Sequence, residues 1–187
     1  MNMFFNLLVG IDYNALWAIF ISLALLICLI YLITVVLSFA FMLNFRKKIK
    51  KGKETINVVL FQKNDSLMKL ASLLQEHLKE DNPLAIFAKN EELKKYNELK
   101  AEEFDEFYNY SEKILNCAQR IYISYDFSIN DSYIKDVFLT LVELNNKYFE
   151  SVQLYNTNVI GYNYWRNLFS TRWIKNILFI KEIDTIK

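Results

Sequence analysis

Residues 13–53, YNALWAIFISLALLICLIYLITVVLSFAFMLNFRKKIKKGK, decide the fold of this chain. No side chain between Asp12 and Arg46 carries a formal charge, and this run exceeds the roughly 20 apolar residues that a helix needs to span a bilayer. Six bases follow within the next eight residues. Because Lys and Arg beside a span resist translocation, the sequence predicts a transmembrane helix over residues 14–45, with residues 1–13 outside the cell and the rest of the chain in the cytoplasm.

The six bases form a juxtamembrane collar, residues 46–53, that we expect to contact anionic lipid headgroups. The collar bases are Arg46, Lys47, Lys48, Lys50, Lys51 and Lys53. In residues 54–187 acids outnumber bases, so a nucleic-acid surface is not indicated. A secretory signal peptide would carry its positive charges before a shorter apolar core, and a lipoprotein signal would need a small residue in place of Ile27 before Cys28. We therefore expect a single-pass protein of the cell (inner) membrane.

The rest of the chain has the pattern of long helices. The whole chain contains only 3 Gly and 1 Pro, which disfavours a fold full of tight turns. Apolar residues recur at steps of three and four along four stretches, which are residues 46–80, 84–124, 131–169 and 173–180. Asn82 can cap a helix that begins at Pro83.

These lengths predict an all-α fold, in which the N-terminal transmembrane helix is followed by an antiparallel bundle of three long helices and a short fourth helix. We treat residues 54–187 as one cytoplasmic domain. Gly52 is the one flexible point between the span and the first bundle helix, and the sequence leaves open whether the two form one nearly continuous helix.

A segment near the C-terminus carries a family resemblance. Tyr155-Asn156-Thr157-Asn158-Val159-Ile160-Gly161-Tyr162-Asn163 fits the pattern Y-N-x-x-V-x-x-Y-N at every fixed position. With this segment, and with Phe169 seven residues after it, the chain resembles the LemA family of bacterial membrane-anchored helical proteins. The family's paired arginines in the first bundle helix are Gln62-Lys63 here. The resemblance implies an N-terminal span and a cytoplasmic bundle, and it supplies no reaction because the family has no agreed enzymatic activity.

The segment that carries the resemblance is predicted to be structural. Tyr155, Val159 and Tyr162 share one helical stripe, which favours burial, and Asn156 and Asn163 can supply hydrogen bonds at its edge. Direct recognition by the tyrosines is the alternative. Asn145, on the same stripe, resembles the single buried polar residue that sets the register of helical seams.

The residues that follow are rich in aromatic and basic side chains. Counting three alternating helix directions places them at the end of the bundle far from the membrane, where they would form a tip for docking a protein partner. The proposed tip residues are Trp165, Arg166, Arg172 and Trp173. The same aromatics also suit packing of the tail helix on the bundle.

Residue types for catalysis or metal binding are sparse. His77 is the single histidine, and Cys28 and Cys117 lie in segments that cannot pair within one chain. The acidic residues at 102–106 flank a hydrophobic seam and indicate a solvated face. The sequence therefore predicts no enzyme, no cofactor and no metal site, and favours a membrane-bound scaffold or adaptor with a protein partner. The alternative is a homo-oligomer that organises or shapes the membrane.

Overall fold

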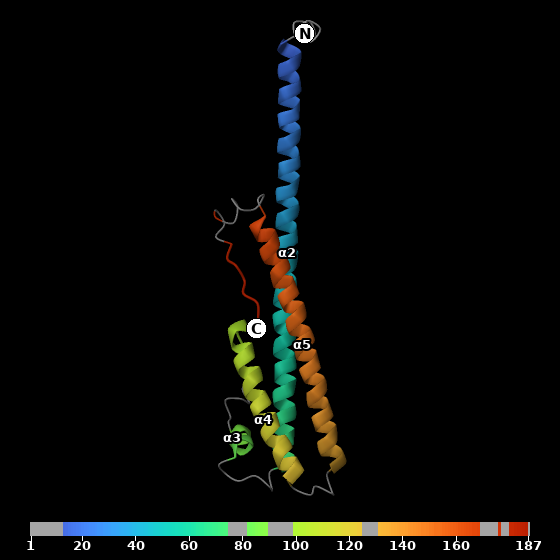
Figure 1. Cartoon of the computed structure of the whole chain (residues 1–187), viewed down its shortest axis with the longest axis vertical. Helices are drawn as coiled ribbons and strands as arrows, with labels where there is room; N and C mark the ends of the chain where they lie inside the picture. Colours follow the sequence, from blue (N-terminus) through green and yellow to red (C-terminus); the bar gives the residue numbers. More distant parts are fainter. Residues whose placement is uncertain are drawn as a thin grey trace, which may run out of the picture. The chain divides into compact units, whose positions relative to one another are not determined.

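The regular structure is helical throughout the part of the chain that the structure describes. The computed structural model describes residues 13–74, 82–89, 99–124, 131–168, 176 and 180–186. Its elements are α2 (Tyr13–Leu74), α3 (Pro83–Lys89), the 3-10 turn η3 (Ala101–Glu103), α4 (Phe104–Ser124) and α5 (Asp131–Asn167) (Figure 1). The all-α class predicted from the sequence is confirmed for these residues.

The chain divides into two compact units. The first comprises Met1–Asn44 and Tyr162–Glu182, and the second comprises Phe45–Gly161 and Ile183–Lys187. Helix α2 is one element of 62 residues that runs on through the collar and Gly52, so the predicted span and the next helical stretch belong to one helix.

The part of α2 in the first unit is apolar and largely exposed, with Ser38 and Met42 as its buried residues among those described. An 18-residue window of α2 reaches a mean hydropathy of 3.0, and none of it is buried. By length and composition the helix can cross a membrane; a signal sequence or the core helix of a soluble protein passes the same test.

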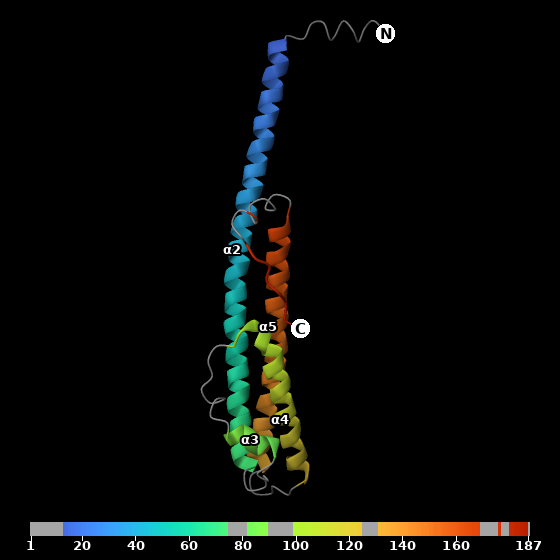
Figure 2. The same cartoon turned by 90° about the vertical axis from the view of Figure 1, so that its left-hand side faces the viewer.

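In the second unit, α4 runs parallel to α2. Asn57 of α2 bonds to Leu99 just before α4, and Lys63 bonds to Glu112 further along, so residue numbers rise together on both helices. Helix α5 runs the opposite way, because Asn145 also meets Glu112 whereas Tyr155, later on α5, meets the earlier Gly52. The three helices lie side by side in both views (Figures 1 and 2). The antiparallel order expected for the first two long helices is therefore wrong.

The reason is a break in the helix expected over residues 84–124. Leu99 and Lys100 are not helical, and the backbone of Lys100 is extended. The side-chain amide of Asn57 accepts the Leu99 N–H at 3.1 Å and donates to the Leu99 carbonyl at 3.4 Å, so a contact across 42 residues satisfies the backbone there. Glu103 Oε2 accepts the Lys100 N–H at 2.8 Å and starts the next helical segment. The chain has thus returned to the level of Asn57 before α4 begins.

The start of α3 follows the sequence signals. Asn82 Oδ1 accepts the backbone N–H of Leu84 at 2.9 Å, and Pro83 is the first helical residue. Asn82 thus caps α3, and the predicted helix start at Pro83 is confirmed. The predicted tail helix at 173–180 lies outside the described residues except for Asn176, which is helical, and Ile180, which is not.

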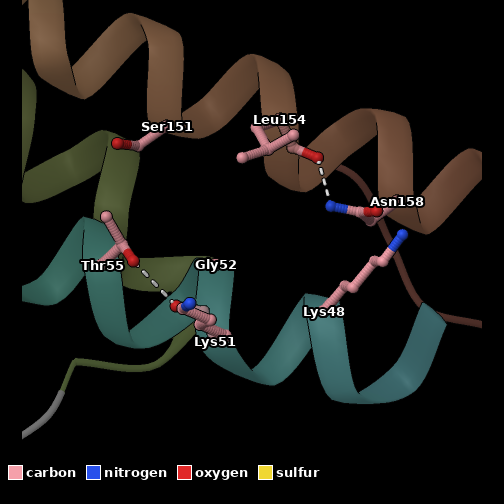
Figure 3. A pocket seen from close by; sticks show the side chains of 7 residues that line it. All are labelled: Lys48, Lys51, Gly52, Thr55, Ser151, Leu154 and Asn158. Carbon is pink, nitrogen blue, oxygen red and sulfur yellow. Dashed lines mark hydrogen bonds between the residues drawn. The ribbon is translucent and has the colours of Figure 1, made fainter. Parts of the chain in front are cut away.

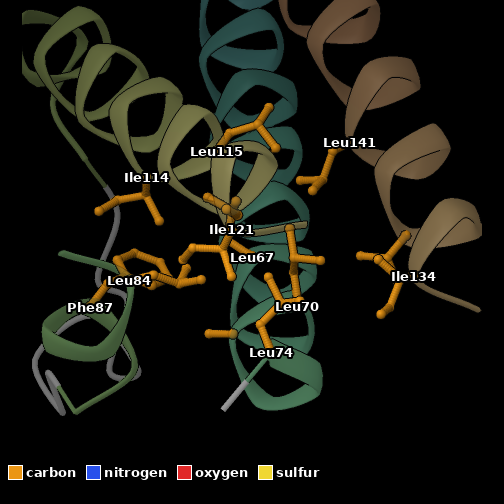
Figure 4. Close-up of a cluster of buried hydrophobic side chains, with 13 residues drawn as sticks. Leu67, Leu70, Leu74, Leu84, Phe87, Ile114, Leu115, Ile121, Ile134 and Leu141 are labelled. Carbon is orange, nitrogen blue, oxygen red and sulfur yellow. The ribbon is translucent and has the colours of Figure 1, made fainter. Parts of the chain in front are cut away.

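The hydrophobic core of the second unit draws on all four α-helices (Figure 4). Apolar residues at helical spacing face one another around the end of α2. The cluster comprises Leu67, Leu70, Ala71, Leu74, Leu84, Phe87, Ile114, Leu115, Ala118, Ile121, Ile134, Val137 and Leu141. This core holds α2, α4 and α5 together and so positions the polar groups described next.

Candidate functional site

The collar bases lie on α2 and are not neutralised. Arg46, Lys47, Lys48, Lys50 and Lys51 are exposed, and Lys53 is half-buried. Among the described residues no carboxylate forms an ion pair with any of them, whereas Lys63, Lys69 and Arg166 each have an acidic partner. Eight helical residues rise about 12 Å, so six positive charges stand within that length of helix. Such a density of unpaired charge attracts anions.

A pocket of about 310 Å³ opens between α2 and α5 beside two of the collar lysines (Figure 3). It is lined by Lys48, Lys51, Gly52, Thr55, Ser151, Leu154 and Asn158. Helices α2 and α5 approach closely at Gly52, because a Cβ at this position would lie 3.5 Å from Tyr155 Cδ2. The sequence indicated the collar but not the pocket, since Ser151 and Asn158 lie about a hundred residues further along the chain.

The polar atoms of the pocket differ in what they already bind. Thr55 Oγ1 donates to the Lys51 carbonyl at 3.0 Å, and Asn158 Nδ2 donates to the Leu154 carbonyl at 2.8 Å (Figure 3). Lys48 Nζ lies 5.6 Å from the centroid of the Phe45 ring. Within the described part of the chain, the hydroxyl of Ser151 and the ammonium of Lys51 make no hydrogen bond.

A second polar site lies inside the second unit. The side chain of Lys63 is 0% exposed, and its Nζ lies 2.6 Å from Glu112 Oε1; the Glu112 side chain is 29% exposed. The same carboxylate oxygen accepts Asn145 Nδ2 at 2.9 Å. Asn145 thus meets the polar group of another helix, as expected of a residue that sets register, while its own Oδ1 is buried without a hydrogen-bond partner among the described residues.

Aromatic rings cover this ion pair. Lys63 Nζ stands 3.9 Å from the centroid of the Tyr108 ring, a cation–π contact, and Tyr108 stacks on Tyr148 at 4.3 Å between centroids. Burial lowers the pKa of Lys63, although the hydrogen bond and the charge of Glu112 act in the opposite sense. Burial also raises the pKa of Tyr108 to about 12, with a smaller contribution from Glu112.

In the sequence, Lys63 interrupts the apolar register of α2, and that interruption is the signal by which the site could have been found. Its partner could not be identified, because Glu112 is 49 residues away. The buried ammonium of Lys63 is held by one anion, Glu112, and by one aromatic ring, Tyr108. The arrangement makes the pair a structural element of the helix interface.

The Tyr-Asn segment is placed as its spacing predicts. Tyr155, Val159 and Tyr162 are buried. Asn156 donates to the Ile186 carbonyl at 2.7 Å and accepts the Ile186 N–H at 2.8 Å, so its amide binds the backbone of the extended C-terminal segment at both polar atoms. Asn163 is half-buried. The pKa of Tyr155 is raised by burial first and by the charge of Asp184 second.

Trp165 and Arg166 do not stand at a free tip. In the first unit the indole of Trp165 stacks on Phe41 of α2, with centroids 4.6 Å apart and planes 15° apart. Arg166 Nε donates to the Ile180 carbonyl at 3.0 Å, and Nη1 meets Glu182 Oε2 at 3.2 Å. The expected position far from the predicted span is wrong, because α4 is parallel to α2 and α5 therefore returns toward the residues that precede the collar. Arg172 and Trp173, as well as His77, lie outside the described residues.

Within the described residues, no group of three or more His, Cys, Asp or Glu side chains is arranged to hold a metal ion. Comparison with protein-family models, with characterised proteins and with solved structures finds no match for this chain.

Proposed function

We propose that the chain is a single-pass membrane protein of the LemA type, with its N-terminus outside and its helical domain in the cytoplasm, and that it acts as a non-enzymatic scaffold. The observation that carries the proposal is the wholly unburied window of mean hydropathy 3.0 on α2, followed in sequence by bases that form no ion pair with any acid in the described part of the chain. A core helix of a soluble protein would be buried, and a cleaved signal would not continue as the same helix into the core of the domain.

The scaffold in this proposal is a helical bundle. Its long members are α2 after the collar, α4 parallel to it, and α5 antiparallel to both, with α3 in the crossover between α2 and α4. The collar binds anionic headgroups through its unpaired charge, at about 1 kcal/mol for each Lys or Arg near the surface. The bundle then stands at the cytoplasmic face, where it recruits a protein partner.

Extraction and labelling test the membrane part. The full-length chain should stay in the membrane pellet at alkaline pH and high salt, and its intact mass should include the N-terminal residues. A cysteine introduced at residue 5 should react with a membrane-impermeant reagent from outside the cell. Release by alkali, or a mass that lacks the apolar run, would refute the anchor; labelling from the cytoplasm alone would reverse the orientation.

A second function, self-assembly that organises the membrane, is favoured by a groove on the outer side of α4 and α5. The groove has a volume of about 500 Å³ and is lined by Gln119, Tyr122, Ile123, Lys135, Phe138, Leu139 and Val142. Ile123 is 82% exposed and Leu139 62%, an apolar surface that a second copy would cover. Light scattering of the detergent-solubilised chain at increasing concentration decides between the two, because a monomer throughout excludes self-assembly.

A further inference from the structure

We propose that the pocket between α2 and α5 binds one phosphate group, carried by an anionic phospholipid headgroup or by a small soluble phosphate ester, with Lys48 and Lys51 supplying charge and Ser151 a hydroxyl donor. This inference rests on the proposed function in one respect: the collar must face the side of the membrane where such phosphates are found.

The electrostatics of the pocket favour an anion. Its lining contains two ammonium groups and no carboxylate, and neither lysine forms an ion pair among the described residues. The two lysines are three residues apart on one helix and therefore lie on one face of α2, from which Lys48 extends toward α5 (Figure 3). A bound phosphate would supply the negative charge that these lining residues lack.

The donors suit a phosphate more than a carboxylate ligand. Lys48, Lys51 and Ser151 present hydrogen-bond donors from two different helices, so an oxygen-rich anion can be bound on opposite sides. Thr55 is beside them, and its hydroxyl can turn from the Lys51 carbonyl to a ligand. The Ser151 hydroxyl and the Lys51 ammonium would not have to break a hydrogen bond within the protein to bind the ligand, because they make none among the described residues.

The size and walls of the pocket set the class of ligand. About 310 Å³ is at the lower end of the range for small-molecule sites, which suits a glycerophosphate-sized group and not a nucleotide. Leu154, which is 62% exposed, and the methylene stems of the two lysines give the pocket apolar walls. Such walls can contact the glycerol and the first acyl carbons of a lipid while the phosphate meets the ammonium groups.

The test uses the full-length chain in a neutral detergent and calorimetric titration with three probes. These are a short-chain phosphatidylglycerol kept below its micelle concentration, the matching phosphatidylcholine, and glycerol 3-phosphate. Monomeric probes present no charged surface, so the general attraction of the collar contributes little. We expect phosphatidylglycerol to bind and phosphatidylcholine, whose phosphate is neutralised by choline, to bind at least tenfold more weakly. Tighter binding of phosphatidylglycerol than of glycerol 3-phosphate assigns the lipid as the source; equal binding assigns the soluble ester.

Matched variants separate the pocket from the collar. Lys48→Ala combined with Lys51→Ala should weaken binding at least tenfold, whereas Lys47→Ala combined with Lys50→Ala removes the same charge from the same helix outside the pocket and should change it less than threefold. Ser151→Ala, which favours the helix and leaves the charge unchanged, should weaken binding threefold to tenfold. Equal losses in the two double variants, or no binding by the parent chain, would overturn the pocket. Neither result touches the membrane anchor, which alkaline extraction measures independently.

Discussion

Removing one partner of the buried ion pair should affect stability very differently from removing the other. The side chain of Lys63 is fully buried, while that of Glu112 keeps 29% of its surface in solvent. Glu112→Gln leaves an ammonium in the interior without its anion, and removal of one partner of a buried pair costs about 3–5 kcal/mol. Lys63→Met leaves a carboxylate that solvent reaches and that Asn145 still contacts, and it removes the cost of burying the ammonium. We expect this second variant to lose about 1 kcal/mol or less.

The pH dependence gives a second readout of the same pair. The pKa of Lys63 is lowered by burial, so it lies below the value in the unfolded chain, about 10.4. Between these two pKa values the unfolded chain binds more protons, and stability therefore rises with pH in that window. Glu112→Gln removes two interactions that raise the pKa, so the window widens downward. The penalty of this variant should shrink as the pH increases from 7 toward 10.

Urea unfolding of the full-length chain in mild detergent, followed by far-ultraviolet circular dichroism, measures these differences. Lys69 and Asp65 form a matched control, because their ion pair at 3.0 Å is exposed on both sides, 59% and 56%. Asp65→Asn should change the free energy of unfolding far less than Glu112→Gln does, because exposed ion pairs on a helix contribute little. Equal losses for Glu112→Gln and Lys63→Met, or a loss for Asp65→Asn as large as that for Glu112→Gln, would refute the reasoning.

Three further perturbations follow from contacts in the second unit. Burial raises the pKa of Tyr148 above its unfolded value near 10, so above pH 10 the folded chain binds more protons than the unfolded chain and loses stability as the pH rises. In unfolding experiments at increasing alkaline pH, Tyr148→Phe should make this loss of stability smaller. Gly52→Ala should stabilise the chain by about 0.5–1 kcal/mol, because the new Cβ would meet Tyr155 at an ordinary contact distance of 3.5 Å. Gly161→Ala should destabilise the chain by about 1–3 kcal/mol, because its Cβ would stand 2.6 Å from the Phe45 ring. Thermal melts that rank the two variants alike would contradict this. Asn156→Ala removes both hydrogen bonds to Ile186, so the C-terminal segment should be cut faster by a carboxypeptidase and the Ile186 amide should exchange faster, with no change in helix content.

Features of the fold that depend on local spacing could be predicted from the sequence. The buried stripe through Tyr155, Val159 and Tyr162 follows from steps of four and three on a helix, and Pro83 could only begin a helix and not continue one. The collar is likewise a matter of composition. Each of these signals is contained within about ten residues of chain.

The direction of α4 could not be predicted, because the deciding contact is distant. Nothing in residues 84–124 interrupts a helical pattern with Gly or Pro, yet the chain is not helical at Leu99, where the amide of Asn57 bonds to the backbone. The break seen at Leu99 and Lys100 makes α4 parallel to α2, and this changes the direction expected for the helices that follow. The position expected for Trp165 was wrong for the same reason.

The pocket and the ion pair share this dependence on distant residues. A lysine inside an apolar register indicates a buried charge, but no spacing rule connects Lys63 with Glu112, 49 residues away. Gly52 was expected to be a flexible point in the chain. In the structure it is helical, and it lines the pocket together with Ser151.

The hydrogen bond of Asn145 to Glu112 helps to fix how α5 is aligned along its neighbours, and this alignment also positions the α5 residues that line the pocket. Its buried Oδ1 has no hydrogen-bond partner among the described residues, so Asn145→Leu should leave stability equal or raise it by about 1 kcal/mol. A shift of α5 by one heptad would, however, put Val152 opposite Glu112, and the native amide disfavours that shift. Without the amide, we expect the position of Ser151 opposite Thr55 in the pocket (Figure 3) to be less strictly fixed. Cysteines introduced at these two positions, in a chain without its native cysteines, should cross-link less completely in the Asn145→Leu variant. Unchanged cross-linking together with unchanged stability would show that the apolar stripes alone set the register.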